Sequence, residues 1–286
     1  MSKLRQAMTD AMLVRGFAVR THRSYLGAVE GLTKYYDNRS PVRLSTEEIQ
    51  AYFLYMVKDR HLSPATCRLS LNGIRFLYQE VLHREFEAKI QVPKRPQKIP
   101  ELLTRKEVAA ILEACHNRKH RMLLTLCYGC GLRVGELCHL KVKDIDGERL
   151  LLRIGQGKGA KDRMVEIPKT LLLQLRRYWQ LFRPHDWFFP GREPDTALGV
   201  CSAQKCFKAS KCKARVNKLG GIHGLRHAYA THQLAAGMPI TKLQHQMGHK
   251  DIHTTLRYVH WIPNYQGGDD GTDLIADLEA DHEKKK

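Results

Sequence analysis

The segment GHKDIHTTLRYVH, residues 248–260, decides how this chain is interpreted. It predicts one short helix over 252–259 and places Tyr258 on that helix, nine residues after His249. The phenol of a tyrosine is a weak nucleophile because its ordinary pKa is about 10. A tyrosine that attacks a substrate therefore needs cationic and proton-accepting side chains from other parts of the chain.

Such side chains lie upstream in three short motifs. They are Arg133 in GLRVGEL, Lys158 in GKGAKDR, and the pair His223 and Arg226 in HGLRH. The His-x-x-Arg spacing places the last two residues about one helical turn apart, so both can face one target. Planar guanidinium groups bind the nonbridging oxygens of a phosphodiester in bidentate fashion, which lysine cannot do. The motifs therefore predict a site that holds a phosphodiester and attacks it with a phenol.

The order of these motifs resembles that of the tyrosine recombinases, also called the phage-integrase family, and the resemblance runs through most of the chain. It implies that Tyr258 attacks DNA, forms a 3′-phosphotyrosyl link and releases a 5′-hydroxyl. Arg133 and Arg226 are then the clamp on the phosphate. The hairpin offers two lysines, and the family selects the one between two glycines, Lys158, as the general acid for the leaving oxygen.

The remaining site residues follow from the same resemblance. His223 is the expected helper that accepts the proton of the phenol, and His249 is expected to hydrogen-bond the scissile phosphate. Glu136 matches an acidic position of the family and is expected to orient a neighbouring basic group, and a structural carboxylate explains it nearly as well. No metal ion and no nucleotide cofactor are implied, because the cationic side chains supply the positive charge that a metal would bring.

The overall charge agrees with a polyanionic partner. The 286 residues carry 48 Lys and Arg against 29 Asp and Glu, a formal net charge of +19. Cationic side chains that neutralise phosphates release condensed counterions, so this excess favours nucleic acid over a merely basic soluble protein. Residues 269–286 hold seven acids against three lysines. The charge that faces DNA therefore belongs to the body of the chain and not to its tail.

The eight cysteines do not predict a disulfide framework in a basic chain of this length. Cys127 and Cys130 form a CxxC in the apolar run MLLTLCYGC without the second pair that a zinc site needs, so we expect small buried hydrophobic side chains. The N-terminus lacks the apolar core of a signal peptide, and no window approaches the ~18 apolar residues of a membrane span. We expect a bacterial cytoplasmic, nucleoid-associated protein without membrane contact.

The predicted fold is mainly α-helical with one small β-sheet or hairpin. Residues 1–90 show the periodicity of about four helices, and 91–100, with three prolines, predict a basic linker. Residues 101–262 carry the catalytic motifs, and 263–286 form an acidic tail. The resemblance implies a two-domain C-shaped DNA clamp. Its first domain is a SAM-like helical core-binding domain, and its second is the tyrosine-recombinase catalytic domain.

Local signals predict where several elements begin and end. Capping boxes begin two helices, and they are formed by Ser45 with Glu48 and by Thr104 with Glu107. Pro64 suits the first position of another helix. The stretches 150–154 and 163–167 flank a glycine-rich turn and predict a hairpin. Further helices are expected at 168–182, about 200–217, 224–236 and 239–247.

Several polar residues are expected to contact DNA. In the first domain these are Arg23, Ser24, Arg68, Asn72 and Arg75; in the linker they are Lys94, Arg95 and Lys98; and in the hairpin it is Lys161. Surface salt bridges explain the residues of the first domain equally well, and ordinary solvation explains those of the linker.

The family resemblance also implies the partners. They are duplex DNA with paired inverted half-sites, a second protomer on each site, and a homotetramer in the synapse. The segment after the tyrosine docks on a neighbouring protomer in the family, and Leu274, Ile275 and Leu278 offer one helix face for this. A disordered acidic tail is the alternative. The stretch from Trp187 to His223 is too short for the extra helix of integron integrases, which favours a Xer-like or mobile-element recombinase.

Three other functions compete with recombination. A zinc enzyme would use the pairs His223–His227 and His245–His249, which each share a helix face, but no carboxylate set completes such a site. A type IB topoisomerase would nick and reseal one duplex with similar residues and without strand exchange. A non-catalytic DNA-binding module would share the fold, but all six catalytic positions hold competent residues.

Overall fold

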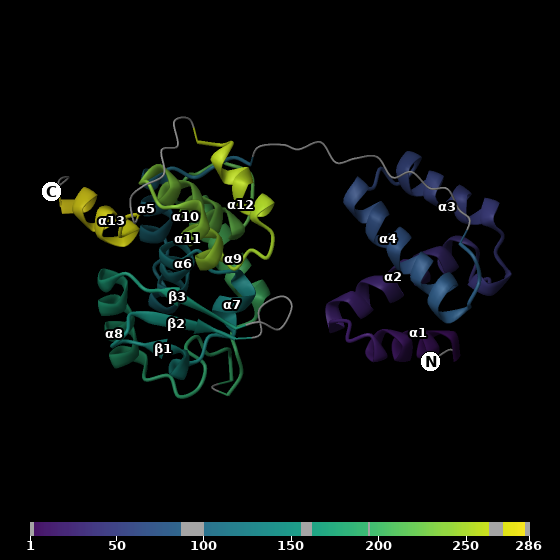
Figure 1. Ribbon diagram of the computed structural model, residues 1–286, viewed down its shortest axis with the longest axis horizontal. Helices are drawn as coiled ribbons and strands as arrows, with labels where there is room; N and C mark the ends of the chain where they lie inside the picture. The colour runs from purple at the N-terminus through teal and green to yellow at the C-terminus, as the bar shows by residue number, and fades with distance from the viewer. Residues whose placement is uncertain (1–2, 87–99, 156–161, 194, 263–270, 284–286) are drawn as a thin grey trace. The chain divides into compact units, whose positions relative to one another are not determined.

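The computed structural model describes residues 3–86, 100–155, 162–193, 195–262 and 271–283. The chain divides into two compact units, Met1–Lys98 and Ile99–Lys286 (Figure 1). Each unit has its own hydrophobic core. The described residues form a mainly α-helical protein with one small three-stranded sheet. The fold class predicted from the sequence is confirmed.

The first unit is built from helices. Its elements are α1 (Lys3–Val14), α2 (Val19–Tyr35), η1 (Pro41–Arg43), α3 (Thr46–Lys58), α4 (Pro64–Phe76) and η2 (Leu77–Val81). The predicted capping box begins α3, because the backbone N–H of Ser45 donates to Glu48 at 2.8 Å and the N–H of Glu48 donates back to the Ser45 hydroxyl at 3.3 Å. Pro64 occupies the first turn of α4, as predicted.

Helices α2 and α4 pack closely at the centre of this unit because Gly73 of α4, which has no side chain, faces α2. A Cβ atom at Gly73 would lie 3.0 Å from the Cα of Tyr25 and 3.2 Å from the Cβ of Ala28. A larger residue at Gly73 would therefore push the two helices apart. Leu32 of α2 and Ile74 of α4 are fully buried on this side, so the opposite face of α4 is left to solvent.

That outer face carries residues that the sequence predicts to contact DNA. Arg68, Asn72 and Arg75 recur at the spacing of one helix face on α4 and are exposed, as is Arg23 on α2. Ser24 is half-buried, and its hydroxyl donates to the carbonyl of Arg20 in the same helix at 3.0 Å. Their contact with DNA stays a prediction. The linker residues Lys94, Arg95 and Lys98 lie outside the described residues.

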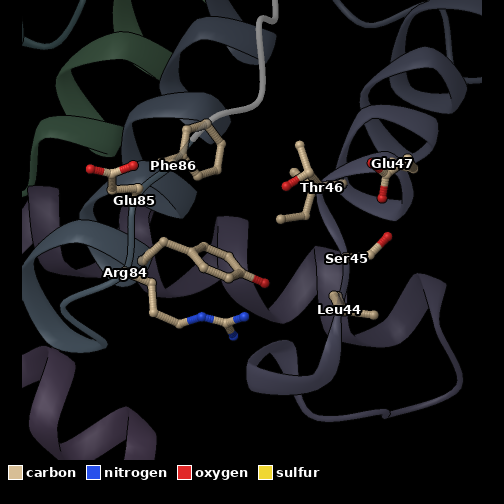
Figure 2. Close-up of a pocket in the computed structure, with 9 residues that line it drawn as sticks. Leu44, Ser45, Thr46, Glu47, Arg84, Glu85 and Phe86 are labelled. Carbon is tan, nitrogen blue, oxygen red and sulfur yellow. The ribbon is translucent and has the colours of Figure 1, made fainter.

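A small cavity of about 270 Å³ lies beside the start of α3 (Figure 2). Its walls come from residues 44–47, Ile49, Tyr78 and residues 84–86. The Tyr78 hydroxyl donates to the carbonyl of Pro41 at 2.5 Å, and Arg84 donates to the carbonyl of Val42 at 2.7 Å. These bonds fasten the segment after α4 to the turn before α3, so the polar groups of this cavity serve the fold.

The second unit contains the sheet and the remaining helices. Its helices are α5 (Arg105–Glu113), α6 (Arg118–Cys130), α7 (Val134–Cys138), η3 (Val142–Asp144), α8 (Lys169–Phe182), α9 (Val200–Lys213), α10 (His223–Ala235), α11 (Ile240–Met247), α12 (Ile252–Val259) and α13 (Leu274–Glu283). The capping box predicted at Thr104 and Glu107 begins α5. No helix within the described ranges is long and apolar enough to cross a membrane.

The sheet has the order β1 (Ile145–Asp146), β2 (Leu151–Ile154), β3 (Arg163–Glu166), with both pairings antiparallel. Leu152 pairs with Val165, and both side chains are buried, whereas Arg153 and Met164 alternate to the exposed face. The predicted hairpin is confirmed in its two strands, and its turn, residues 156–161, lies outside the described residues.

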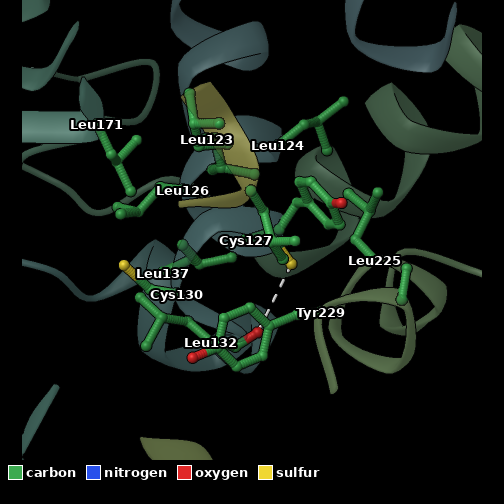
Figure 3. Close-up of a cluster of buried hydrophobic side chains, with 14 of the residues drawn as sticks. Leu123, Leu124, Leu126, Cys127, Cys130, Leu132, Leu137, Leu171, Leu225 and Tyr229 are labelled. Atoms are coloured by element: carbon green, nitrogen blue, oxygen red, sulfur yellow. Dashed lines mark hydrogen bonds between the residues drawn. The ribbon is translucent and has the colours of Figure 1, made fainter. Parts of the chain in front are cut away.

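Helix α6 forms the centre of the second core, since every residue from Met122 to Cys130 is buried. Figure 3 shows Cys127 and Cys130 among the leucines of this core, and the Cys127 thiol donates to the carbonyl of Leu132 at 3.6 Å. Burial raises the pKa of the Cys127 thiol to about 12. Both cysteines therefore behave as the small apolar residues that the sequence predicts.

The acidic tail forms helix α13, which packs on its own chain against α6, α8 and α10. Leu274, Ile275 and Leu278 are buried there, and Asp277 accepts a hydrogen bond from Arg105 at 2.9 Å. The apolar face predicted for the tail thus exists. In this structure it is covered by the second unit, which argues against the alternative of a disordered tail over residues 271–283.

Candidate active site

The first arginine of the predicted site stands where α6 ends and α7 begins. Helix α6 ends at Gly131, whose φ of 61° is left-handed and whose added Cβ would lie 2.3 Å from the Tyr229 ring. The glycine therefore allows a tight turn that makes Arg133 the N-cap of α7. The Arg133 guanidinium donates to Glu136 at 2.8 Å and to the carbonyl of Gly248 at 2.9 Å.

Glu136 is the centre of a buried ionic network. Arg163 of β3 donates to both Glu136 oxygens at 2.9 Å, and its Nε donates to the carbonyl of Gln246 at 3.2 Å. Burial raises the pKa of Glu136, but the hydrogen bonds and charges of Arg163 and Arg133 outweigh it and hold the pKa at about 2. Glu136 is therefore ionised and holds two guanidinium groups, and its role in the reaction stays a prediction.

Arg226 of α10 is the most deeply buried cation of the site, with 1 % of its surface exposed. It donates to the carbonyls of Gly131 and Met247 at 2.6 Å each, and its Nη2 lies 3.0 Å from Nε2 of His249. Burial and the charge of Arg133 lower the pKa of Arg226 to about 10, so it remains charged at neutral pH. Within the described residues no carboxylate forms an ion pair with it.

The partners of His249 fix its tautomer. A guanidinium can only donate, so Nε2 of His249 accepts from Arg226, and Nδ1 carries the proton and donates to the Thr255 hydroxyl at 2.9 Å. Burial and the charge of Arg226 lower the pKa of His249 to about 3. The imidazole is therefore neutral, and its Nε2 presents a lone pair towards Arg226.

These groups line one cavity of about 590 Å³. Its walls are Arg133, His223, Arg226, residues 248–251 and Thr254. Burial, with the charges of Arg226 and Arg133, lowers the pKa of His223, so this imidazole is also neutral. The structure thus brings together both arginines and His249, which the sequence assigns to the phosphate, and His223, which it assigns to the proton of the phenol. They come from α7, α10 and the segment between α11 and α12.

Tyr258 lies on α12 and is not among the residues that line this cavity. Its ring is parallel to that of His249 at a centroid distance of 6.2 Å, and it packs edge-on against Trp261. The residue is 4 % exposed, and burial raises the pKa of its phenol. The hydroxyl lies 2.9 Å from Nδ1 of His227, a residue to which the sequence assigns no role at the phosphate. His223, the expected helper, lines the cavity instead.

The resemblance to recombinases assigns no role to two residues that the structure places at the site. Arg163 stands inside the quoted motif GKGAKDR, and His227 stands inside HGLRH. Their positions within the motifs are the only sequence signal, because their contacts depend on elements distant in the chain. The predicted general acid Lys158 and the predicted DNA contact Lys161 both lie outside the described residues.

The histidine pairs that suggest zinc have other partners. Nδ1 of His227 contacts Tyr258, and both ring nitrogens of His249 contact Arg226 and Thr255. Over the described parts of the chain, no three or more His, Cys, Asp or Glu residues are grouped to hold a metal ion.

Comparison with known proteins agrees with this geometry. The model of the phage integrase family matches residues 101–264, and that of the SAM-like N-terminal domain of phage integrases matches residues 4–88. The chain belongs to the phage integrase family. It is a tyrosine recombinase, an enzyme of site-specific recombination.

Two relatives illustrate the range of this recombinase family. A Sinorhizobium fredii protein, y4qK, provisionally named an integrase/recombinase, is 37 % identical over 269 residues, which cover 92 % of this chain and 86 % of the relative. Tyrosine recombinase XerA of Pyrococcus horikoshii is 33 % identical over 208 residues, or 72 % of this chain and 73 % of that protein. These relatives do not favour the topoisomerase alternative.

Solved structures share the recombinase fold. The crystal structure of a lambda integrase dimer bound to a core site has a TM-score of 0.72 and 17 % identity, and covers 88 % of this chain and 95 % of that one. A lambda integrase tetramer bound to a Holliday junction has a TM-score of 0.73 and 17 % identity, with 94 % and 78 % covered. At this identity the likeness concerns the fold alone.

Proposed function

We propose that this recombinase cuts and rejoins duplex DNA through a 3′-phosphotyrosyl bond on Tyr258, and that it integrates, excises or resolves mobile DNA as a Xer-like or mobile-element recombinase. The observation that carries the proposal is the environment of Arg226. A guanidinium that is 1 % exposed is bound to two carbonyls and an imidazole, none of which neutralises its charge. A buried cation without a carboxylate in direct contact is costly unless a ligand supplies the anion.

The missing charge fits the nonbridging oxygens of a phosphodiester. Arg226 is held rigidly by the carbonyls of Gly131 and Met247, and Arg133 is held by Glu136 and Gly248. Both guanidinium groups therefore reach the cavity in fixed orientations, which lowers the cost of binding the charge that develops in the transition state. His223 lines the same cavity and supplies a further contact to the phosphate.

His249 changes its role when the phosphate arrives. Its Nε2 accepts a hydrogen bond from Arg226, so it donates to a phosphate oxygen only after this nitrogen gains a proton. A phosphate placed beside Arg226 offsets the charge that helps to lower the pKa of His249. We expect the imidazole to be protonated in the DNA complex and to donate to the scissile phosphate.

Lys158 completes the reaction in this proposal. The 5′-oxygen that leaves phosphorus needs a proton, and the Lys158 ammonium is the proposed donor. Arg163 follows the turn that holds Lys158 by two residues. It donates to Glu136, the carboxylate that also binds Arg133. The base of the hairpin is thus attached to the phosphate clamp, which supports a role for its turn in the reaction.

The proposed partner is duplex DNA with two inverted half-sites, bound by a homodimer on each site and by a homotetramer in the synapse. The lambda integrase structures of this fold, a dimer on a core site and a tetramer on a Holliday junction, support these assemblies. The exposed face of α4 that carries Arg68, Asn72 and Arg75 is the proposed DNA contact of the first unit. Action on such DNA also suggests a bacterial cytoplasmic, nucleoid-associated enzyme.

The test uses a duplex with a nick placed so that the released 5′-hydroxyl segment diffuses away after cleavage. We expect the wild-type protein to become covalently attached to this suicide substrate. Tyr258→Phe should bind the DNA with unchanged affinity and form no covalent product, because phenylalanine has no oxygen to attack phosphorus. Attachment that persists in Tyr258→Phe would show that another residue is the nucleophile.

A second variant tests the clamp separately. Arg226→Lys keeps the positive charge but loses the fixed pair of donors, so we expect attachment to slow by about 100-fold or more. Tyr128→Phe is a matched control in the same core, since it loses a buried hydroxyl that contacts His232 and not the cavity. Attachment by Tyr128→Phe should follow the wild type.

A further inference from the structure

The phenol of Tyr258 and the imidazole of His227 form a hydrogen-bonded pair that the proposed roles leave unused. His227 lies on α10 and Tyr258 on α12, and the two helices pack against each other. The Tyr258 oxygen and Nδ1 of His227 are 2.9 Å apart. Trp261 packs edge-on against both rings, with centroid distances of 5.0 Å to Tyr258 and 5.9 Å to His227. The pair is therefore shielded from solvent on that side.

The protonation states of the pair determine the direction of the bond. Burial raises the pKa of Tyr258, so the phenol keeps its proton. Burial, competition with His223 for a proton and the charges of Arg226 and Arg257 lower the pKa of His227 to about 4, so the imidazole is neutral. A neutral imidazole has one nitrogen that accepts. If Nδ1 donated instead, the phenol proton would be buried without an acceptor among the described residues, at a cost of about 1–3 kcal/mol.

His223 is placed for a different task. It stands one helical turn before His227, with its ring edge-on to that of His227 at a centroid distance of 4.8 Å. It lines the cavity with Arg133 and Arg226, whereas His227 does not belong to the cavity wall. Of the two histidines of the motif HGLRH, His223 therefore lies at the cavity proposed for the phosphate, and His227 contacts the proposed nucleophile.

We propose that His227 is a catalytic residue of this recombinase, and that it takes the proton of Tyr258 as the phenol attacks the phosphodiester. The proposal rests on the function proposed above, with Tyr258 as the nucleophile. It assigns the role of proton acceptor to His227 in place of His223.

Two protons move in this step, one from Tyr258 and one to the leaving 5′-oxygen. The proton on the Tyr258 oxygen moves to Nδ1 of His227, the bond between that oxygen and phosphorus forms, and the bond from phosphorus to the 5′-oxygen breaks. Lys158 gives a proton to the leaving 5′-oxygen. In the reverse step a 5′-hydroxyl attacks the phosphotyrosyl bond, and the His227 imidazolium returns the proton to Tyr258.

The charges around His227 make this step depend on DNA. His223 and Arg226 face it from α10, and Arg257 and Tyr258 face it from α12. In the DNA-free protein the charges of Arg226 and Arg257 oppose an imidazolium at His227. A phosphodiester in the cavity brings negative charge next to Arg226 and so favours the protonated imidazole. His227 becomes an effective base when the scissile phosphate is in place.

The test measures single-turnover covalent attachment of the full chain to the nicked suicide duplex. We expect His227→Ala to lower the attachment rate by about 100-fold, the typical contribution of a general base, with unchanged affinity for DNA. Added imidazole should restore part of the rate in His227→Ala and have no effect on the wild type. Attachment at the wild-type rate in His227→Ala would overturn the proposal. Full activity of His227→Gln would also overturn it, if added imidazole does not restore the rate of His227→Ala.

His232 offers a matched control on the same helix. Its Nδ1 lies 2.9 Å from the Tyr128 hydroxyl, which is the same type of half-buried His–Tyr contact away from the cavity. His232→Ala should therefore leave the rate near that of the wild type. An equal loss in His232→Ala and His227→Ala would trace the effect to stability and refute the catalytic role. Should His227→Ala not fold, His227→Gln replaces it, and full activity without the imidazole ring would then overturn the proposal.

A substrate with sulfur in place of the 5′-bridging oxygen separates the two proton transfers. A thiolate leaves without a proton, so this substrate should restore activity to Lys158→Ala and not to His227→Ala. Rescue of His227→Ala by the sulfur substrate would assign His227 to the leaving group and overturn the proposal. If the wild-type protein forms no covalent product with either substrate, the proposed function itself fails, which is distinct from a failure of His227 alone.

Discussion

Arg163 and Glu136 form a closed pair in which both terminal nitrogens of the guanidinium donate to the two carboxylate oxygens at 2.9 Å. Their side chains are 10 % and 7 % exposed. Arg163 also lies under the segment that carries His249, since a Cβ at Gly248 would approach its Nε to 2.7 Å. One ion pair therefore connects strand β3, the N-cap arginine of α7 and the turn after α11.

We predict that Arg163→Lys weakens both the fold and the reaction. Lysine keeps the charge but cannot make the two parallel hydrogen bonds, so the buried carboxylate of Glu136 loses a hydrogen bond. We expect this to lower the free energy of unfolding by about 2 kcal/mol. Covalent attachment should slow, because Glu136 then orients Arg133 less rigidly. Urea unfolding and single-turnover cleavage measure the two effects.

Arg153→Lys is the control for this change. Arg153 pairs with Asp162 on the same sheet, but the two side chains are 59 % and 47 % exposed. An exposed pair contributes about 0–1 kcal/mol, so stability should hardly change. Equal destabilisation by Arg163→Lys and Arg153→Lys would show that the buried network has no special role.

We predict that Gly131→Ala is strongly destabilising. The residue has a φ of 61°, and the new methyl group would lie 2.3 Å from the Tyr229 ring. Strain and overpacking together should cost about 3 kcal/mol or more, measured by urea unfolding. Gly27→Ala is the control, because nothing lies within 4 Å of its added Cβ. That change should stabilise α2 by about 0.5–1 kcal/mol, and a loss there would contradict the structure.

We predict that the stability of the second unit falls as the pH falls from about 6.5 to about 4. Burial lowers the pKa of His227 and His232 to about 4 and that of His249 to about 3, from the ordinary 6.5. Over this window the unfolded chain binds more protons than the folded one, so acid favours unfolding by up to about 1.4 kcal/mol per pH unit for each histidine. Above the ordinary pKa their contribution is fully present.

Urea unfolding of the DNA-free protein at several pH values measures this slope. His232→Gln should make the slope shallower, since it removes one of the buried groups. His253→Gln should leave it unchanged, because His253 is exposed. A stability that is constant across this pH range would contradict the burial of these imidazoles.

We predict that Ile275→Ala destabilises the second unit by about 3 kcal/mol, the cost of a cavity in a packed core. Ile275 is 2 % exposed, and a Cβ at Gly129 of α6 would lie 3.2 Å from its Cγ1. Since α13 packs on its own chain, the loss should not depend on protein concentration. Glu279→Gln, at an exposed position of the same helix, should change the stability by less than about 0.5 kcal/mol. A concentration-dependent loss would indicate that α13 exchanges between protomers.

The elements that could be predicted from the sequence are those determined by local contacts. The capping boxes at Ser45 and Thr104 involve residues three positions apart, and the hairpin strands alternate buried and exposed side chains. The end expected for the helix at about 200–217 is wrong by a few residues, since α9 ends at Lys213. The two-residue strand β1 was missed because it is too short to show any periodicity.

The sequence alone determined the order of the chemistry: one arginine, a hairpin lysine, a His-x-x-Arg pair, a further histidine and a late tyrosine. Only the tertiary structure decided which histidine meets the phenol. His223 and His227 stand four residues apart on α10 and share one helix face, so their spacing does not distinguish them. The packing of α12 on α10 brings Tyr258 to His227. Such a contact between distant segments cannot be deduced from the spacing of residues within one helix.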